Sequence, residues 1–174
     1  CVWGWGNLVC LPTCATKPLE AEPVNVPFPQ ADSFDRVINL CELLASEEIL
    51  TKTNITENYG FDKRQTDYYI NACKYLGLAE AQEHGFILTK KAKEVFTKNI
   101  QLRRKFFIEQ MLGRKVFKEA LSLYFQQVAM PTNNQLVEIM RNAKLPDINS
   151  EVTFRRRAST VRAWIDWIVA KIEY

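Results

Sequence analysis

The stretch EVTFRRRASTVRAWIDWI, residues 151–168, has two different surfaces if it forms a helix. Its apolar residues recur at alternating spacings of four and three, which is the pattern of a helix with one buried face. The sequence therefore predicts a helix that is anchored on one side and polar on the other. The expected buried stripe comprises Phe154, Ala158, Val161, Ile165 and Ile168.

The polar side of this helix suits the major groove of double-stranded DNA. The groove admits one α-helix, Arg donates two hydrogen bonds to the edge of guanine, and Ser or Thr can contact phosphates or bases. A solvated basic face is the other interpretation of the same pattern. The residues that the spacing leaves on the polar side are Arg155, Arg156, Ser159, Thr160 and Arg162.

Composition and charge favour a globular chain with one basic end. The 174 residues are 47% hydrophobic and 25% charged, which suits one ordinary domain or two small ones. The net charge of +3 is uneven: it is −1 over residues 1–30, −2 over 31–98 and +6 over 99–174. A basic surface attracts polyanions, so we expect nucleic acid to meet the last part of the chain.

Nothing in the sequence indicates a membrane protein or a secreted one. No stretch approaches the roughly 18 uninterrupted apolar residues of a membrane span. The apolar opening, residues 1–15, lacks a basic start and is broken by Gly and Pro, so a secretory signal is not expected. The chain begins at Cys1 and not at Met, which suggests a fragment or a processed protein. We therefore expect a cytoplasmic protein with no membrane partner.

The five cysteines form no recognisable disulfide or metal pattern. Their number is odd and their contexts differ. Cys41 and Cys73 lie among apolar helical positions and are expected to be small core residues. Cys1, Cys10 and Cys14 match no zinc-binding spacing. No metal site is predicted.

The first part of the chain has the element order of a winged helix. Residues 1–30 form a proline-rich arm or linker, and residues 31–98 follow as one unit. This unit has three expected helices, a hairpin and a further helix, over 34–45, 51–59, 62–76, 78–81 with 85–88, and 89–96. A tight turn at Gly60 separates the second and third helices, as in a helix-turn-helix.

The third helix of this unit is the second candidate for a groove contact. Its outward residues are expected to be Lys63, Arg64, Tyr68, Asn71 and Lys74. Winged helices also serve as protein-contact modules, and the net charge of −2 favours that alternative for this unit.

The remaining residues, 99–174, are expected to be entirely helical. Helices are predicted over 100–112, 115–127, 133–143 and 151–168, with Phe125 among the expected core residues. The last two helices form a second helix-turn-helix. The helix from Asn133 supports the pair, and the helix from Glu151 is the one expected to contact the bases. Trp164 and Trp167 are expected in the core or at an interface, and not as base-stacking platforms. The fold class is mainly α: a winged helix followed by a second helical helix-turn-helix unit.

Three segments together resemble the tandem helix-turn-helix DNA-recognition region of prokaryotic type II restriction endonucleases. They are FDRVINLCELLA, DKRQTDYYINACKYLGL and FRRRASTVRAWIDWI, and the resemblance spans about residues 33–168. In that family the region accompanies a nuclease domain and is thought to recognise DNA. The resemblance implies DNA-facing roles for Arg64, Gln65 and Tyr68 in the first unit and for Arg155, Arg156, Arg157, Ser159, Thr160 and Arg162 in the second.

The catalytic residues of such an enzyme are not found in this sequence. These nucleases need two acidic metal ligands and a Lys, with the last acid and the Lys one residue apart on a strand. Asp147 lies between expected helices, and Glu151 is followed two residues later by Thr153. We predict no catalytic residues and no cofactor in this chain, and Mg²⁺ only where a nuclease domain is attached.

Three functions therefore stand as hypotheses. The first is a sequence-specific module for double-stranded DNA, the target-recognition part of a restriction endonuclease, with a nuclease domain and a second copy of the chain as further candidate partners. The second is a helical adaptor for protein partners or a transcriptional regulator. The third is an intact nuclease whose active site is unrecognised, with ligands hidden in residues 1–30.

Overall fold

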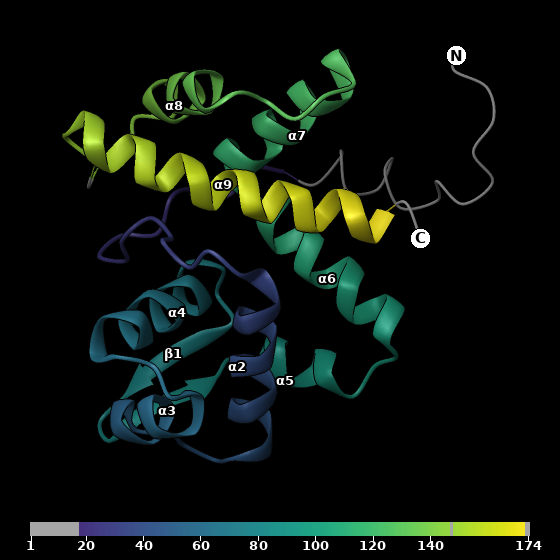
Figure 1. Ribbon diagram of the computed structural model, residues 1–174. Helices are drawn as coiled ribbons and strands as arrows, with labels where there is room; N and C mark the ends of the chain where they lie inside the picture. The colour runs from purple at the N-terminus through teal and green to yellow at the C-terminus, as the bar shows by residue number, and fades with distance from the viewer. Residues whose placement is uncertain (1–17, 147, 173–174) are drawn as a thin grey trace.

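The computed structural model describes residues 18–146 and 148–172, and these are mainly helical with one small hairpin (Figure 1). The expectation of a mainly α fold with a two-stranded antiparallel sheet is confirmed. Its first elements are α2 (Phe34–Ser46), α3 (Lys52–Tyr59), α4 (Lys63–Tyr75), β1 (Ala79–Gln82), β2 (Gly85–Leu88) and α5 (Lys90–Phe96). The later ones are α6 (Ile100–Leu112), α7 (Lys115–Gln127), α8 (Asn133–Asn142) and α9 (Glu151–Ile172).

Side-chain caps fix where several of these helices begin. Helices α3, α4 and α8 each begin with a capping box. The side chain of the cap residue accepts a hydrogen bond from the N–H of the third helical residue, and the side chain of that third residue accepts one from the N–H of the cap residue. The cap residues are Thr51, Asp62 and Thr132. Gly60 ends α3 in the left-handed conformation, at φ 59°, as its position in the sequence predicts.

The hairpin is pinned to the segment between α2 and α3. Strands β1 and β2 pair with Ala79 opposite Leu88 and Gln82 opposite Gly85. Leu50 adds a third, isolated partner, because its N–H donates to the Phe86 carbonyl at 3.1 Å and its carbonyl accepts from the Phe86 N–H at 2.9 Å. Gly85 passes so close to Leu50 that no side chain fits between the two backbones.

Helix α9 crosses the middle of the molecule (Figure 1). It contacts the first half of the chain, residues 31–98, and also other helices of the second half, residues 99–174. It packs against α8 and α7 on one side and against α2 on the other. Trp164 is fully buried between the rings of Phe34 and Phe117, both 5.0 Å away, and its indole N–H donates to the Ala31 carbonyl at 2.9 Å. Trp167 donates to Asp35 at 2.8 Å. The core assignment of both tryptophans is confirmed.

Two details of the helical part differ from the expectation. Helix α9 continues to Ile172 and does not stop at Ile168, because Val169 and Ile172 still pack against the core. Phe125, expected in the core, is 45% exposed. It lies in the last turns of α7, where its ring meets only Tyr124 edge-on among the aromatic contacts of the described residues.

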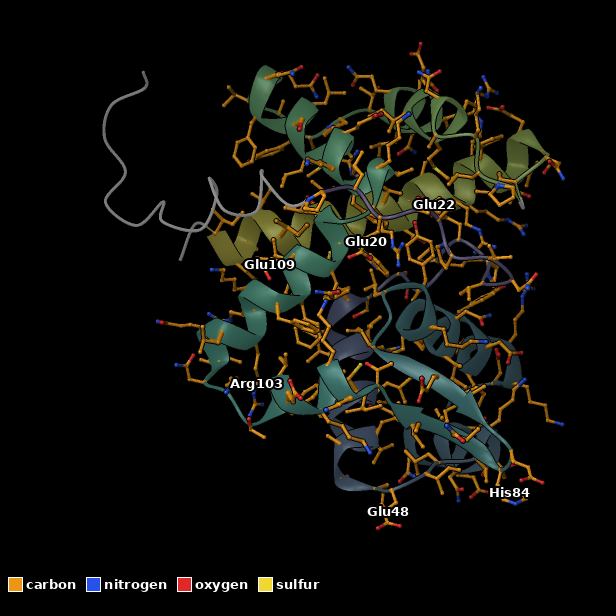
Figure 2. All side chains as sticks on the ribbon, turned by 180° about the vertical axis from the view of Figure 1, so that it is seen from behind. Glu20, Glu22, Glu48, His84, Arg103 and Glu109 are labelled. Atoms are coloured by element: carbon orange, nitrogen blue, oxygen red, sulfur yellow. The ribbon has the colours of Figure 1, made fainter. Side chains whose placement is uncertain are left out.

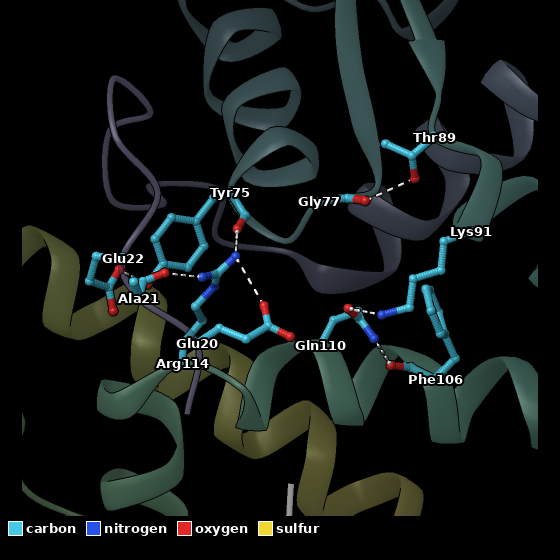
Figure 3. Close-up of polar contacts among 10 residues, drawn as sticks. All are labelled: Glu20, Ala21, Glu22, Tyr75, Gly77, Thr89, Lys91, Phe106, Gln110 and Arg114. Carbon is cyan, nitrogen blue, oxygen red and sulfur yellow. Dashed lines mark hydrogen bonds and ion pairs between the residues drawn. The ribbon is translucent and has the colours of Figure 1, made fainter. Parts of the chain in front are cut away.

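Several residues of the described part of the proline-rich arm pack between the unit of residues 31–98 and the unit of residues 99–174, whereas Leu19 and Val24 are exposed (Figure 3). Phe28 is buried between Tyr75 of α4 and Phe117 of α7. Arg114, which precedes α7, is buried and donates to the carbonyls of Ala21 and Tyr75 at 2.5 and 2.8 Å. One guanidinium therefore joins the arm, α4 and the start of α7.

Cys41 of α2 and Cys73 of α4 are confirmed as small core residues. Both are fully buried, and their Sγ atoms are 3.7 Å apart. The hydrogen bond to Cys73 and burial raise the pKa of the Cys41 thiol well above its usual value, so it stays protonated and unreactive at neutral pH. Cys1, Cys10 and Cys14 lie outside the described residues.

Gly85→Ala should destabilise the chain by more than about 2 kcal/mol. The added Cβ would lie 2.4 Å from the Leu50 carbonyl oxygen, so the bridge between Leu50 and Phe86 must open. Urea unfolding followed by circular dichroism measures the loss. Gly60→Ala is the matched control. An added Cβ at Gly60 meets no atom, so only the left-handed φ is unfavourable, and the free energy of unfolding should fall by about 1 kcal/mol. Equal losses in the two variants would contradict the steric explanation.

Glu22→Gln should stabilise the chain more at pH 7 than at pH 4. Burial raises the pKa of Glu22 above its ordinary value of 4.5, against the opposing effects of the Tyr75 hydroxyl and the Arg114 guanidinium. The folded state therefore favours the protonated acid, and stability falls as the pH rises from about 4.5 through the folded pKa. Gln is neutral at both pH values and can still accept the hydrogen bond from Tyr75. The urea midpoints of wild type and Glu22→Gln at pH 7 and pH 4 test this. A stabilisation by Glu22→Gln that is larger at pH 4 than at pH 7 would contradict it.

Candidate functional site

The exposed strip of α9 is the candidate site. The buried side of the helix rests on α2, α7 and α8, so the opposite side is held towards solvent. Along that side, exposed residues recur at helical spacing over the first three turns. They are Glu151, Val152, Arg155, Arg156, Ser159 and Arg162, and we call these six residues the α9 strip.

Four of the residues expected to face DNA lie on the α9 strip. Arg156 and Arg162 are exposed and form no ion pair or side-chain hydrogen bond within the described part of the chain. Arg155 is exposed and pairs with Glu151. Ser159 donates to the backbone carbonyl of Arg155 at 3.3 Å, and its hydroxyl remains exposed as an acceptor.

Thr160 does not belong to the exposed side, and its expected outward position is wrong. Its exposure is 2%, because α9 is covered over a wider arc than the stripe of Phe154, Ala158, Val161, Ile165 and Ile168 suggested. Trp164 and Trp167 are buried as well, and α2, α7 and α8 all pack against this helix. Arg157 is half-buried, its Nε is shielded from solvent, and it interacts with the protein. Neither side chain is well placed to contact an external ligand.

An ion-pair cluster stands at the start of the α9 strip. The carboxylate of Glu151 pairs with Arg155 one turn later at 3.2 Å and also with Arg141 from the last turn of α8. The Arg141 guanidinium lies over the Phe154 ring, 5.5 Å from its centre. All three charged groups are about half exposed, so the cluster is part of the surface. The periodicity of the sequence did not reveal Arg141, because it lies on a different helix.

The outward face of α4 is polar but partly engaged with its own helix. Arg64 lies over the Tyr68 ring at 5.5 Å and donates through Nε to the Tyr68 hydroxyl. Gln65 accepts from the Asp62 N–H at 3.3 Å as part of the helix cap. Lys63 is exposed, and Asn71 and Lys74 are half-exposed without a partner among the described residues.

The face of α4 carries one carboxylate, as the α9 strip does with Glu151. Asp67 lies on it and pairs with Lys52 of α3 at 2.6 Å. A carboxylate beside Lys63 and Lys74 weakens the attraction for a polyanion. Because Arg64 and Gln65 are engaged within α4 and Lys74 is only half-exposed, this face is the weaker of the two candidate surfaces.

The rest of the described chain offers little for catalysis or metal binding. The one His, His84, lies at the exposed tip of the hairpin, beside Glu83 at 4.0 Å and far from α9 (Figure 2). Within residues 18–146 and 148–172, no three His, Cys, Asp or Glu residues are grouped so that they could hold a metal ion. Asp147 lies outside the described residues. A small hollow between the arm and Leu145, lined by Glu22 and Tyr75, has room for about one water molecule.

No helix in the described part of the chain combines the length and the apolar character that crossing a membrane requires.

Comparison with known proteins places the chain in a family. A family model described as "Domain of unknown function (DUF7226)" matches residues 36–173. This match covers most of the chain, so the chain belongs to the DUF7226 family. No curated protein and no solved structure matches it.

Proposed function

We propose that this chain is a sequence-specific binding module for double-stranded DNA, and that α9 enters the major groove. The observation that carries the proposal is the α9 strip, where three exposed arginines and a serine face solvent from a helix whose other side is buried. A helix held by its buried side and carrying exposed guanidinium groups can contact phosphates and guanine edges together.

The arrangement of α8 and α9 supports a helix-turn-helix role for this pair. Residues 143–150 connect the two helices, which pack closely against each other. In such pairs the first helix braces, and the N-terminal residues of the second contact base edges. Arg155 and Arg156 lie near the N-terminal end of α9, which this geometry places against the bases, and Arg162 lies near the middle of the helix. The basic excess of +6 over residues 99–174 adds an attraction for phosphate.

The first half of the chain supports a second, weaker contact. Helices α2, α3 and α4, followed by the hairpin with its extra bridge from Leu50, have the element order of a winged helix. In that geometry α4 is the reading helix and presents Lys63, Arg64, Tyr68, Asn71 and Lys74. We propose that α4 assists by phosphate contacts while α9 carries most of the specificity.

The biological setting we propose is target recognition in a restriction-modification system. This rests on the resemblance of three helical segments to the recognition region of type II restriction endonucleases. A nuclease domain is then the partner that cuts, using Mg²⁺ in its own active site. A second copy of this chain would let the module bind a palindromic site, whereas two reading helices in one chain suit an asymmetric one.

A protein-binding role is the second candidate, and it has a specific observation in its favour. Val128 is 87% exposed and follows the exposed Phe125 at the end of α7. Exposed apolar residues of this kind are common in protein interfaces. An adaptor would bind its partner with little dependence on DNA, so the measurements below separate the two functions.

Binding of duplex DNA should weaken steeply with salt. Arg155, Arg156 and Arg162 with Lys63 and Lys74 can neutralise about five phosphates, which predicts a log–log slope near −4 or −5. Fluorescence anisotropy of a labelled random duplex between about 50 and 300 mM salt measures the slope. Absence of binding at the lowest salt, or binding that ignores salt, would contradict the proposal.

Arg156→Ala and Arg162→Ala should each weaken DNA binding without unfolding the chain, because both side chains are exposed. A residue that reads a base should lose about 1–3 kcal/mol of discrimination at one base pair, whereas one that holds phosphate should weaken all sequences alike. Selection of binding sites from a random pool distinguishes the two. Lys93→Ala, an exposed cation on α5, is the control and should change little. Equal losses in all three variants would show that only total charge matters.

A further inference from the structure

The carboxylate of Glu151 holds two arginines at the start of the α9 strip. Its Oε1 accepts from Nε of Arg155 at 3.2 Å, and its Oε2 accepts from a terminal nitrogen of Arg141. Each of the two carboxylate oxygens therefore binds a different arginine. The contact also joins the last turn of α8 to the first turn of α9, because Arg141 and Glu151 lie on those two turns.

Arg141 is held on a second side by an aromatic ring. Its guanidinium lies 5.5 Å from the centre of the Phe154 ring, and Phe154 packs against the core. A guanidinium fixed by a carboxylate and a ring has few orientations left. The cluster is therefore an ordered feature of this surface, although each ion pair alone contributes little to stability.

The contact with Glu151 leaves the two terminal nitrogens of Arg155 free to bind a base. A guanidinium has five N–H donors, and Arg155 uses only Nε, the donor nearest its own backbone. The two terminal nitrogens form the fork that can donate to both O6 and N7 of guanine. The Arg155 side chain is 61% exposed, so this fork is open to solvent. A carboxylate that binds Nε fixes the plane of the fork without occupying it.

We propose that Glu151 is a positioning residue that orients Arg155 to read a guanine in the major groove. This proposal rests on the proposed DNA-binding function and adds to it a base identity and a division of roles. Arg155 contacts the base, and Glu151 acts through Arg155. Arg141, held by the same carboxylate, keeps free donors that can contact the phosphate beside that base.

The test is selection of duplex sites from a random pool, followed by affinity measurements on the selected site and on single-base variants of it. Wild type should select a guanine whose preference disappears in Arg155→Ala, with a loss of about ten- to a hundredfold at that base pair. Glu151→Gln should reduce the preference for the same guanine by about three- to tenfold. Its affinity for unrelated DNA at low salt should stay the same or rise, because a negative charge is removed near the phosphates.

Two further variants separate orientation from charge. Glu151→Asp keeps the charge but shortens the side chain, so it should also lose the guanine preference. Asp166→Asn removes one negative charge from the exposed side of α9 farther along the helix, and should leave the preference intact. The double variant Glu151→Gln with Arg155→Ala should lose as much of the guanine preference at this base pair as Arg155→Ala alone, because Glu151 acts only through Arg155.

The outcomes distinguish failure of this inference from failure of the DNA-binding proposal. If Glu151→Gln strengthens binding to every sequence and keeps the guanine preference, Glu151 only lowers the affinity by its charge and the inference is wrong. If Glu151→Asp behaves like wild type, orientation plays no part and the inference is equally wrong. If wild type neither binds duplex DNA nor enriches any sequence, the proposed function itself fails. Thermal unfolding of each variant confirms that these effects arise in a folded protein.

Discussion

The packing of Trp164 is the constraint on which the arrangement of this molecule depends. Its indole is buried between Phe34 of the first half and Phe117 of the second, and it donates to the carbonyl of Ala31. An indole N–H without a partner in the core would be costly, so this hydrogen bond fixes the depth and rotation of α9. The rotation of α9 in turn decides which of its side chains face solvent. The direction of the arginines is thus a consequence of core packing.

The positions of the helices and of the hairpin could be read from the sequence because local signals specify them. Thr51, Asp62 and Thr132 cap helices that begin at the next residue, and Gly60 ends α3 in a conformation that suits glycine. The bridge from Leu50 to the hairpin and the burial of Arg114 could not be read in this way. Both depend on residues far apart in the chain, and no pattern within one segment reports such a contact.

The candidate site was predicted in outline and is smaller than expected. Arg155, Arg156, Ser159 and Arg162 are exposed as the helical spacing predicts, but Thr160 is buried and Arg157 is half-buried. A narrow apolar stripe fits a helix that packs on one neighbour, whereas α9 packs on α2, α7 and α8 together. The neighbours of a helix set the width of its buried arc. For the same reason the pairing of Glu151 with Arg141 became visible only when α8 and α9 were placed side by side.

The central claim is that the exposed guanidinium groups of α9 contact a DNA duplex, and it can be tested by observing them directly. Two-dimensional NMR of the arginine Nε–H groups, recorded while a duplex is added, reports contact at each side chain. The account predicts that the signals of Arg155, Arg156 and Arg162 shift with the duplex, while that of the buried Arg114 stays in place. If the α9 signals remain unchanged at saturating duplex, or only arginines outside α9 respond, the account is wrong.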